Sequence, residues 1–402
     1  MEGCVFKIST THLNRWARLA AAVLVLMFSG IIYAWSNINL PLTEFGWSAS
    51  ALTFNYTLSV WFFCIGGLIS GFLSKKISPI LRMMGSAALL FAGFWLVSCL
   101  KDGSSILLLY LGYALMAGTG IGIVYNAVIA TISGWFPDKK GLCSGALMMG
   151  FGLSSFLIGL LAGSLLESGN VDWRVIYRVM GGICGIVILL GSFLIKAPEK
   201  AAAKAAKPLS GMTPGQMLKR ASFWKLFIYF ILLSAVGSSA IAFARSYSIS
   251  LGLAQNIAVV FAAVVAIANS LGRLASGAIA DHFGLTKTKH ITSAVAIAAP
   301  VLALLGAMLS APVLGIPGLL LCGFSYGFSP TVSAAFTMEF YGQKDYASNL
   351  SIINLVLIPG AFVPTLASAI LTASGGSYVP VFSLLIGFSL IGLVLNLTIK
   401  EA

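Results

Sequence analysis

Charged residues are scarce in this sequence. Only 9% of its 402 residues are charged and 59% are hydrophobic, whereas a soluble globular domain has about 25% charged residues. A chain of this composition cannot build a water-compatible surface, which excludes a soluble domain. Apolar runs over 19–35, 106–132 and 379–397 approach or exceed the roughly 20 residues that a helix needs to cross a bilayer. The sequence therefore predicts an all-α membrane protein.

Acidic residues, histidines and cysteines are also few, at 11, 3 and 6. The cysteines stand singly in apolar segments, which is typical of small packing residues and not of a disulfide or metal framework. The glycine-rich segment 118–122 follows no strand and lacks the third glycine of a dinucleotide site, so we interpret it as a helix-packing surface. The sequence shows no catalytic nucleophile with a general base near it. We expect no enzyme activity, no metal and no cofactor.

Basic residues give a net charge of +13, which could indicate nucleic-acid binding, but their distribution argues against it. Most basic residues fall on one side of the expected membrane, and the other side carries only Lys101, Arg174, Arg178 and Arg245. This bias predicts that both termini lie in the cytoplasm. We expect a multi-pass, monomeric protein of a bacterial inner (plasma) membrane, with the lipid bilayer and no nucleic acid as its partner.

Polar breaks divide the chain into twelve expected spans. An even number agrees with both termini lying on one side. A hydrophilic stretch rich in Ala, Lys and Pro, 196–220, is expected to be a cytoplasmic linker between an N-terminal half (1–195) and a C-terminal half (221–402). The spans are 17–40, 48–73, 79–99, 105–134, 141–166, 175–195, 222–247, 256–280, 290–310, 314–338, 347–372 and 379–398.

Internal repetition supports this division. Segment 71–76 after the second span corresponds to 277–282 after the eighth, and 136–140 corresponds to 340–344, both at an offset of roughly 205 residues. Two parallel six-helix halves resemble the architecture of the major facilitator superfamily. Segment 277–284 also resembles the loop motif of that family, in which an Asp pairs across the cytoplasmic gate.

The resemblance to the loop motif makes Asp281 a gating candidate. The first copy of the motif departs from the pattern, because Lys75 stands where the Asp is usual and Ser78 where the second Gly is usual. The usual ion pair is therefore not expected there, although Lys75 stays a gating candidate. Asp138, in the loop after the fourth span, and Glu339, at the end of the tenth, complete the expected gate.

A more specific resemblance runs through spans four and five. Segments 120–125, 135–142, 144–145 and 150–152, followed by 212–218, 223–224, 251–253 and 271–273, are similar to the oxalate/formate antiporter family, whose relatives include the monocarboxylate transporters. The block Trp135–Leu142 is the most specific part. The resemblance implies a transporter of a small organic anion.

Arg273 is the most informative single residue. It precedes Asp281 by eight residues, which places it roughly 12 Å inside the boundary of a core that is about 30 Å thick. A buried Arg costs at least about 2.5 kcal/mol on insertion scales and usually marks a substrate or ion pathway. No acidic residue falls at mid-membrane depth, so we expect the guanidinium to bind a substrate carboxylate. The alternative is an Arg that only locks helices together.

Asn269 lies on the same helical face, four residues before Arg273, and could orient the guanidinium or bind the substrate. In the resembling family the Arg of this helix binds the carboxylate, and members that carry dicarboxylates have a second cation in helix eleven. The matching stretch here, Asn349–Leu357, contains no Lys. With Leu357 in that place, a monocarboxylate is favoured over oxalate.

Aromatic residues at suitable depth could form the walls of the site. A tyrosine hydroxyl can hydrogen-bond a carboxylate, and Tyr125 belongs to the matched block. The residues retained as candidates are Tyr33, Tyr125, Tyr326 and Phe328.

Together these observations predict a secondary active transporter of a monocarboxylate of the lactate, pyruvate or formate type. It would work by alternating access, either exchanging anions or carrying a proton with its substrate. Two alternatives remain: a proton-driven exporter of lipophilic compounds, disfavoured by the lack of a core acid, and a membrane anion sensor that does not transport.

Overall fold

The computed structural model describes residues 14–198 and 210–399. Within these ranges all regular secondary structure is helical, apart from one bridge between Gly211 and Gly342. Part of the expected linker, 199–209, lies outside the described residues. The elements of the first half and of the second half, in chain order, are α1 (Arg15–Ser29), η1 (Gly30–Ala34), α2 (Trp35–Ile38), η2 (Leu40–Phe45), α3 (Ala49–Leu73), α4 (Pro79–Ser98), α5 (Ile106–Leu109), η3 (Tyr110–Ala117), α6 (Gly118–Ser133), α7 (Lys140–Ser168) and α8 (Trp173–Leu194), then α10 (Pro214–Leu218), α11 (Ala221–Ser250), α12 (Gln255–Phe283), α13 (Leu285–Leu309), α14 (Pro312–Tyr341), α15 (Tyr346–Ile353), η4 (Asn354–Val356), α16 (Leu357–Gly360), α17 (Val363–Ala373) and α18 (Val379–Thr398).

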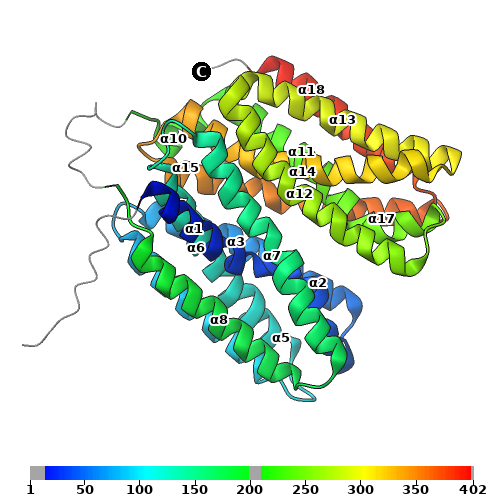
Figure 1. The fold of residues 1–402 in the computed structure, drawn as a ribbon, viewed down its shortest axis with the longest axis horizontal. Helices are drawn as coiled ribbons and strands as arrows, with labels where there is room; N and C mark the ends of the chain where they lie inside the picture. Colours follow the sequence, from blue (N-terminus) through cyan, green and yellow to red (C-terminus); the bar gives the residue numbers. More distant parts are fainter. Residues whose placement is uncertain (1–13, 199–209, 400–402) are drawn as a thin grey trace, which may run out of the picture.

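Twelve helices of the described chain are long and apolar enough to cross a membrane. Figure 1 shows them as two bundles, one built from the first six and the other from the last six. The expected fold class, an all-α membrane protein with two six-helix halves, is confirmed. Several membrane helices consist of more than one element: α1 with η1 forms the first (Arg15–Ala34), and α15 to α17 form the eleventh (Tyr346–Ala373).

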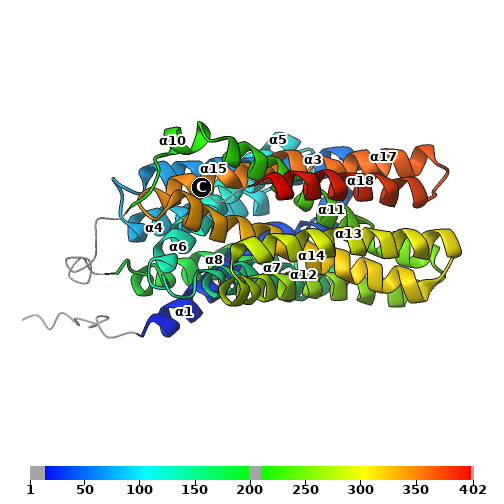
Figure 2. The same cartoon turned by 90° about the horizontal axis from the view of Figure 1, so that it is seen from above.

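The first membrane helix begins and the last one ends on the same side of the molecule, which is also the side of α10 (Figure 1). We call this the terminal side and the other the opposite side. The two halves meet through two pairs of helices, α12 against α7 and α15 against α3. Figure 2 shows the pair formed by α3 and α15 on one face of the molecule and the pair formed by α7 and α12 on the other.

The internal repeat is visible at the C-terminus of the last helix of each half, where a basic side chain from the first helix of the same half donates to a backbone carbonyl. Arg18, in the first membrane helix, donates from Nη1 to the carbonyl of Leu194, where α8 ends (2.7 Å). Lys225, in the seventh, donates from Nζ to the carbonyl of Thr398, where α18 ends (3.2 Å). A cation at a helix C-terminus satisfies free carbonyls and opposes the negative end of the helix dipole. Both halves therefore use the same device.

The first and eleventh membrane helices are interrupted near mid-depth. At Gly30, where η1 begins, an added Cβ would lie 2.1 Å from the carbonyl oxygen of Phe151, so only glycine allows α7 to approach this closely. In the eleventh helix, η4 and Pro359 break the α-helical pattern. The carbonyl of Asn354 in η4 accepts a hydrogen bond from the Cys64 thiol across the halves (3.5 Å). Backbone irregularity in a membrane is tolerated where protein or a cavity satisfies it, and both breaks border the cavity described next.

Candidate functional site

A cavity lies between the halves at the level of these breaks. Its volume of about 20 Å³ has room for little more than one water molecule. The walls must therefore move apart before a larger solute can enter. The lining residues are Tyr33, Phe63, Tyr125 and Phe151 from the first half, and Ser234, Arg273, Tyr326, Ser329, Pro330, Ser333, Asn354, Val356 and Leu357 from the second.

Arg273 supplies the only charge among these lining residues. It is 2% exposed, its Nε donates to Asn269 Oδ1 (3.2 Å), and its Nη1 donates to the backbone carbonyl of Met148 (2.9 Å). Its guanidinium carbon lies 5.8 Å from the ring centroid of Tyr33. A guanidinium has five N–H donors, so two hydrogen bonds leave donors for the cavity. Within the described ranges no Asp or Glu forms an ion pair with Arg273.

Glycine makes room for this guanidinium. A Cβ added at Gly152 on α7 would lie 2.9 Å from Ser270 Oγ and 3.2 Å from the Arg273 guanidinium carbon. One added at Gly145, two turns earlier, would lie 2.6 Å from the Arg273 carbonyl oxygen. The glycines at 145 and 152 thus allow α12 to pack against α7 with its arginine in between.

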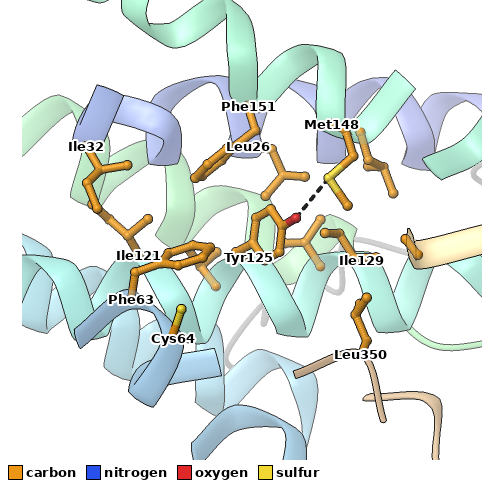
Figure 3. Packing of buried hydrophobic residues seen from close by; sticks show 14 of the residues in the cluster. Leu26, Ile32, Phe63, Cys64, Ile121, Tyr125, Ile129, Met148, Phe151 and Leu350 are labelled. Atoms are coloured by element: carbon orange, nitrogen blue, oxygen red, sulfur yellow. Dashed lines mark hydrogen bonds between the residues drawn. The ribbon is translucent and has the colours of Figure 1, made fainter. Parts of the chain in front are cut away.

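Met148 joins the arginine to the aromatic wall of the cavity. The Tyr125 hydroxyl donates to Met148 Sδ (2.9 Å), as Figure 3 shows, while the backbone carbonyl of the same Met148 holds Arg273. The Tyr125 ring packs against both Phe63 and Phe151, with centroids 5.1 and 4.9 Å away, and these two rings also contact each other (5.9 Å). The first half therefore contributes a packed aromatic wall.

The second half contributes a wall of small polar groups that the sequence analysis missed. The hydroxyls of Ser234 and Ser329 are 2.8 Å apart, and Ser333 donates to the Pro330 carbonyl (3.0 Å). Asn354 lines the same wall and is 8% exposed. No sequence signal distinguishes these residues, because single Ser and Asn residues in apolar helices commonly serve helix packing. Only their position in the fold identifies them.

The structure brings most of the expected site residues together. Arg273, Tyr33, Tyr125, Tyr326 and Leu357 line the cavity, and Asn269 holds the guanidinium from outside the lining.

Phe328 departs from this expectation, because it is buried in the core and its ring packs on Phe324 (centroids 5.2 Å apart). The cavity face of α14 carries Tyr326, Ser329 and Ser333. At about 100° per residue, position 328 points about 200° away from position 326.

Two of the expected gating residues connect the halves on the terminal side, beyond the cavity. Asp281 of α12 accepts hydrogen bonds from the backbone N–H groups of Gly141 and Leu142 on α7, both at 2.7 Å. Glu339 of α14 faces Lys140 of α7 (3.8 Å).

Lys75 and Asp138 differ from what the sequence indicated. Lys75 does form an ion pair across the halves, with Asp345, so the expected lack of a pair at this position is corrected: the pair exists with its charges reversed. Asp138 pairs with Arg15 (2.7 Å) inside the first half. The Arg15 hydrogen bonds hold the pKa of the Asp138 carboxyl below its usual value.

Burial changes along the helices that meet between the halves. The eleventh membrane helix is buried throughout 346–354 but exposed at Phe362, Thr365 and Leu366. In the same way α7 is mostly buried over 141–152 and mostly exposed over 160–168, and α12 is exposed at 255–257 and mostly buried over 269–277. These helices are therefore packed on the terminal side and separated on the opposite side.

Several known transporters have a related sequence. The sequence model of the Major Facilitator Superfamily matches residues 19–363. The oxalate:formate antiporter of Oxalobacter formigenes is 31% identical over 83% of this chain and 80% of its own length. Monocarboxylate transporter 12 of Homo sapiens is 22% identical over 81% of this chain and 67% of its own length.

Solved structures with the same fold are also transporters. A proton:xylose symporter superimposes with a TM-score of 0.74 at 12% identity, covering 96% of this chain and 97% of that one. The transporter FucP in the outward conformation gives a TM-score of 0.72 at 16% identity, covering 96% and 99%. At these identities the likeness concerns the fold alone.

Proposed function

The chain belongs to the Major Facilitator Superfamily, and from this premise we propose that it is a secondary transporter that moves a small monocarboxylate through the cavity at Arg273. The terminal side faces the cytoplasm, where the basic residues gather, and the halves rock about the cavity to expose it to each side in turn. The packing on the terminal side and the exposure on the opposite side support an outward-facing state.

The observation that carries this proposal is the unpaired guanidinium. A buried cation is retained at a cost of several kcal/mol unless a counter-charge arrives. Among the described residues, Arg273 has only neutral partners, Asn269 and the Met148 carbonyl, and it borders a cavity that no acid of this part of the chain lines. A carboxylate would supply the missing charge and match the planar fork of donors.

The single charge favours a monocarboxylate over oxalate. Leu357 lines the cavity in the part of helix eleven where dicarboxylate carriers of the resembling family have a cation. A second carboxylate would there meet an aliphatic side chain and stay uncompensated, which costs several kcal/mol in a low-dielectric site. The relation to the oxalate:formate antiporter therefore extends to anion transport but not to the dicarboxylate.

Coupling to protons through the protein finds no support in this cavity. Among the described residues its lining contains no His, Asp or Glu. We propose exchange of one anion for another, or entry of a proton together with the substrate. The gate on the terminal side would consist of Asp281, Lys75 and Glu339, while Asp138 would hold α1 to the loop before α7.

Replacing Arg273 tests the proposal. The purified protein is placed in liposomes loaded with unlabelled anion, and uptake of labelled lactate, pyruvate, formate and oxalate is measured, together with thermal stability with and without each anion. Arg273→Gln removes charge and fork, so we expect affinity to fall about 100-fold, the value of two charged hydrogen bonds. Arg273→Lys keeps the charge without the fork and is expected to lose about tenfold.

Arg82→Gln is the matched control. Arg82 is also a buried arginine, but it donates to the Ser70 carbonyl and hydroxyl and lies away from the cavity. Its replacement should lower stability without ligand and leave affinity unchanged. If Arg273→Gln behaves like this control, Arg273 only locks helices. A protein that binds anions but shows no uptake or exchange would be a sensor, and stabilisation by lipophilic cations in place of anions would favour the exporter.

A further inference from the structure

Asn354 occupies an unusual position in the wall of the cavity. Asn354 is 8% exposed and lies in η4, where helix eleven is broken. Its backbone carbonyl accepts the hydrogen bond from the Cys64 thiol. Within the described ranges its side-chain amide has no hydrogen-bond partner, and the residue lines the cavity. Two other buried amides do donate to the protein: Asn349 to the Met212 carbonyl and Asn396 to the Lys289 carbonyl.

An amide that lines the cavity and has no protein partner can hydrogen-bond a polar group of a bound ligand. The amide offers two N–H donors and one acceptor oxygen but carries no charge. It can therefore bind a neutral hydroxyl or keto oxygen, whereas a second carboxylate placed there would keep an uncompensated charge. Leu357, three residues further along the same helix face, adds an apolar surface to the lining.

We propose that Asn354 determines specificity by binding a neutral hydroxyl or keto oxygen on the carboxylate that Arg273 holds. This inference rests on the proposed function. It narrows the substrate to short hydroxy or oxo monocarboxylates. Formate and acetate lack the second polar group, and oxalate brings a second charge to a wall that cannot neutralise it.

Paired probes that differ by one hydroxyl test this proposal. Dissociation constants are measured for lactate against propionate and for glycolate against acetate, by thermal stabilisation in detergent and by competition for uptake in liposomes. The wild-type protein should bind the hydroxy acid of each pair about tenfold more tightly or better, because its amide is otherwise left unpaired. Asn354→Leu, of similar size, should abolish this preference, because it weakens the binding of lactate and glycolate more than that of propionate and acetate.

Asn55→Leu is the matched control. Asn55 is fully buried in α3 and its side-chain atoms also lack partners, but it does not line the cavity. Its replacement should leave both ratios as in the wild type. If Asn354→Leu does not fold, Asn354→Ser, which keeps one hydroxyl, should retain a reduced preference.

Two outcomes would overturn the role of Asn354: equal wild-type affinity for the members of each pair, or an Asn354→Leu variant that binds all four acids equally less well. Neither outcome contradicts the proposed function, provided that the acids still bind to the wild-type protein and that Arg273→Gln still abolishes binding. If none of the four acids binds the wild-type protein, the monocarboxylate function itself is wrong.

Discussion

The two joints between the halves on the terminal side occupy equivalent places in the internal repeat but differ in chemistry. In the first joint the end of α12 meets the start of α7, and the Asp281 carboxylate accepts hydrogen bonds from two N–H groups at the N-terminus of α7. In the second joint the end of α3 meets the start of α15. There Lys75 reaches across the halves to Asp345, the residue directly before α15.

Both joints place an acidic residue at the N-terminus of a helix, where the free N–H groups and the helix dipole favour a negative charge. What differs is the half that supplies it. In the first joint the acid, Asp281, comes from the other half of the protein. In the second joint the acid, Asp345, directly precedes the helix itself, and the side chain that reaches over from the other half is a cation, Lys75. The side chain that reaches from one half to the other can therefore be an anion or a cation, as long as a negative charge lies at the N-terminus of the helix.

The joints also differ in how closely the backbones approach. A Cβ at Gly277 would lie 2.1 Å from the carbonyl oxygen of Gly141, so two glycines face each other across the first joint. A Cβ at Gly71 would meet Ser351 Oγ at 2.6 Å and the Ala347 carbonyl at 2.7 Å. In this second joint the Ser348 hydroxyl bridges to the Gly71 carbonyl (2.9 Å). The first joint is a backbone contact, and the second is partly made by side chains that can rotate.

The largest effect is expected from adding a methyl group at these glycines. Gly277→Ala forces two backbones apart and should cost the closed terminal side about 3 kcal/mol, the upper end for overpacking. Gly71→Ala should cost less, because Ser351 can turn away and the backbone carbonyl of Ala347 lies 2.7 Å from the added Cβ, against 2.1 Å for the Gly141 carbonyl at Gly277. Spin labels on the exposed positions 76 and 287 would report the change as a longer distance between the halves, in Gly277→Ala more than in Gly71→Ala. Equal populations of the opened state in both variants would refute the distinction between the two joints.

A charge reversal in the second joint is expected to have an intermediate effect. Lys75→Asp places a second carboxylate beside Asp345, whose side chain is only 2% exposed. We expect a loss of about 1–2 kcal/mol, moderated because the side chain at position 75 is 62% exposed. Adding Asp345→Asn should recover most of this loss, since the acid would then cross from the other half, as in the first joint.

Thermal unfolding in detergent, with Asp345→Asn alone as the control, measures this rescue as a coupling energy. A double variant no more stable than Lys75→Asp would mean that the second joint depends on its specific ion pair and not on an acid at the helix N-terminus.

The sequence was sufficient for the features that depend on regular patterns. Twelve spans follow from apolar length, the halves from the repeat, and the depth of Arg273 from its distance along the helix to Asp281. Irregular features could not be predicted in this way. The break at Asn354–Val356 and the polar wall around Ser329 arise from packing between helices far apart in the sequence.

The reversed ion pair at Lys75 was missed for a related reason. A motif compares residue types at one position, and Lys75 differs from the expected Asp. Its partner, Asp345, lies 270 residues further along the chain and becomes relevant only when α15 packs against α3. The compensation is therefore a property of the joint and not of either segment.

The smallest effect is expected from Glu339, which pairs with Lys140 beside the first joint only. In the repeat, where 136–140 corresponds to 340–344, Lys140 matches Lys344, but the counterpart of Glu339 is Trp135, which carries no charge. Glu339 and Lys140 are 3.8 Å apart, their side chains are 50% and 37% exposed, and they border a cavity of about 180 Å³ on the terminal side. Water and salt screen such a pair, so Glu339→Gln should lower stability by less than about 0.5 kcal/mol, and less again at high salt. Thermal unfolding at low and high ionic strength measures this. A loss as large as that of Lys75→Asp would show that the first joint depends on flanking charges and not mainly on Asp281 at the N-terminus of α7.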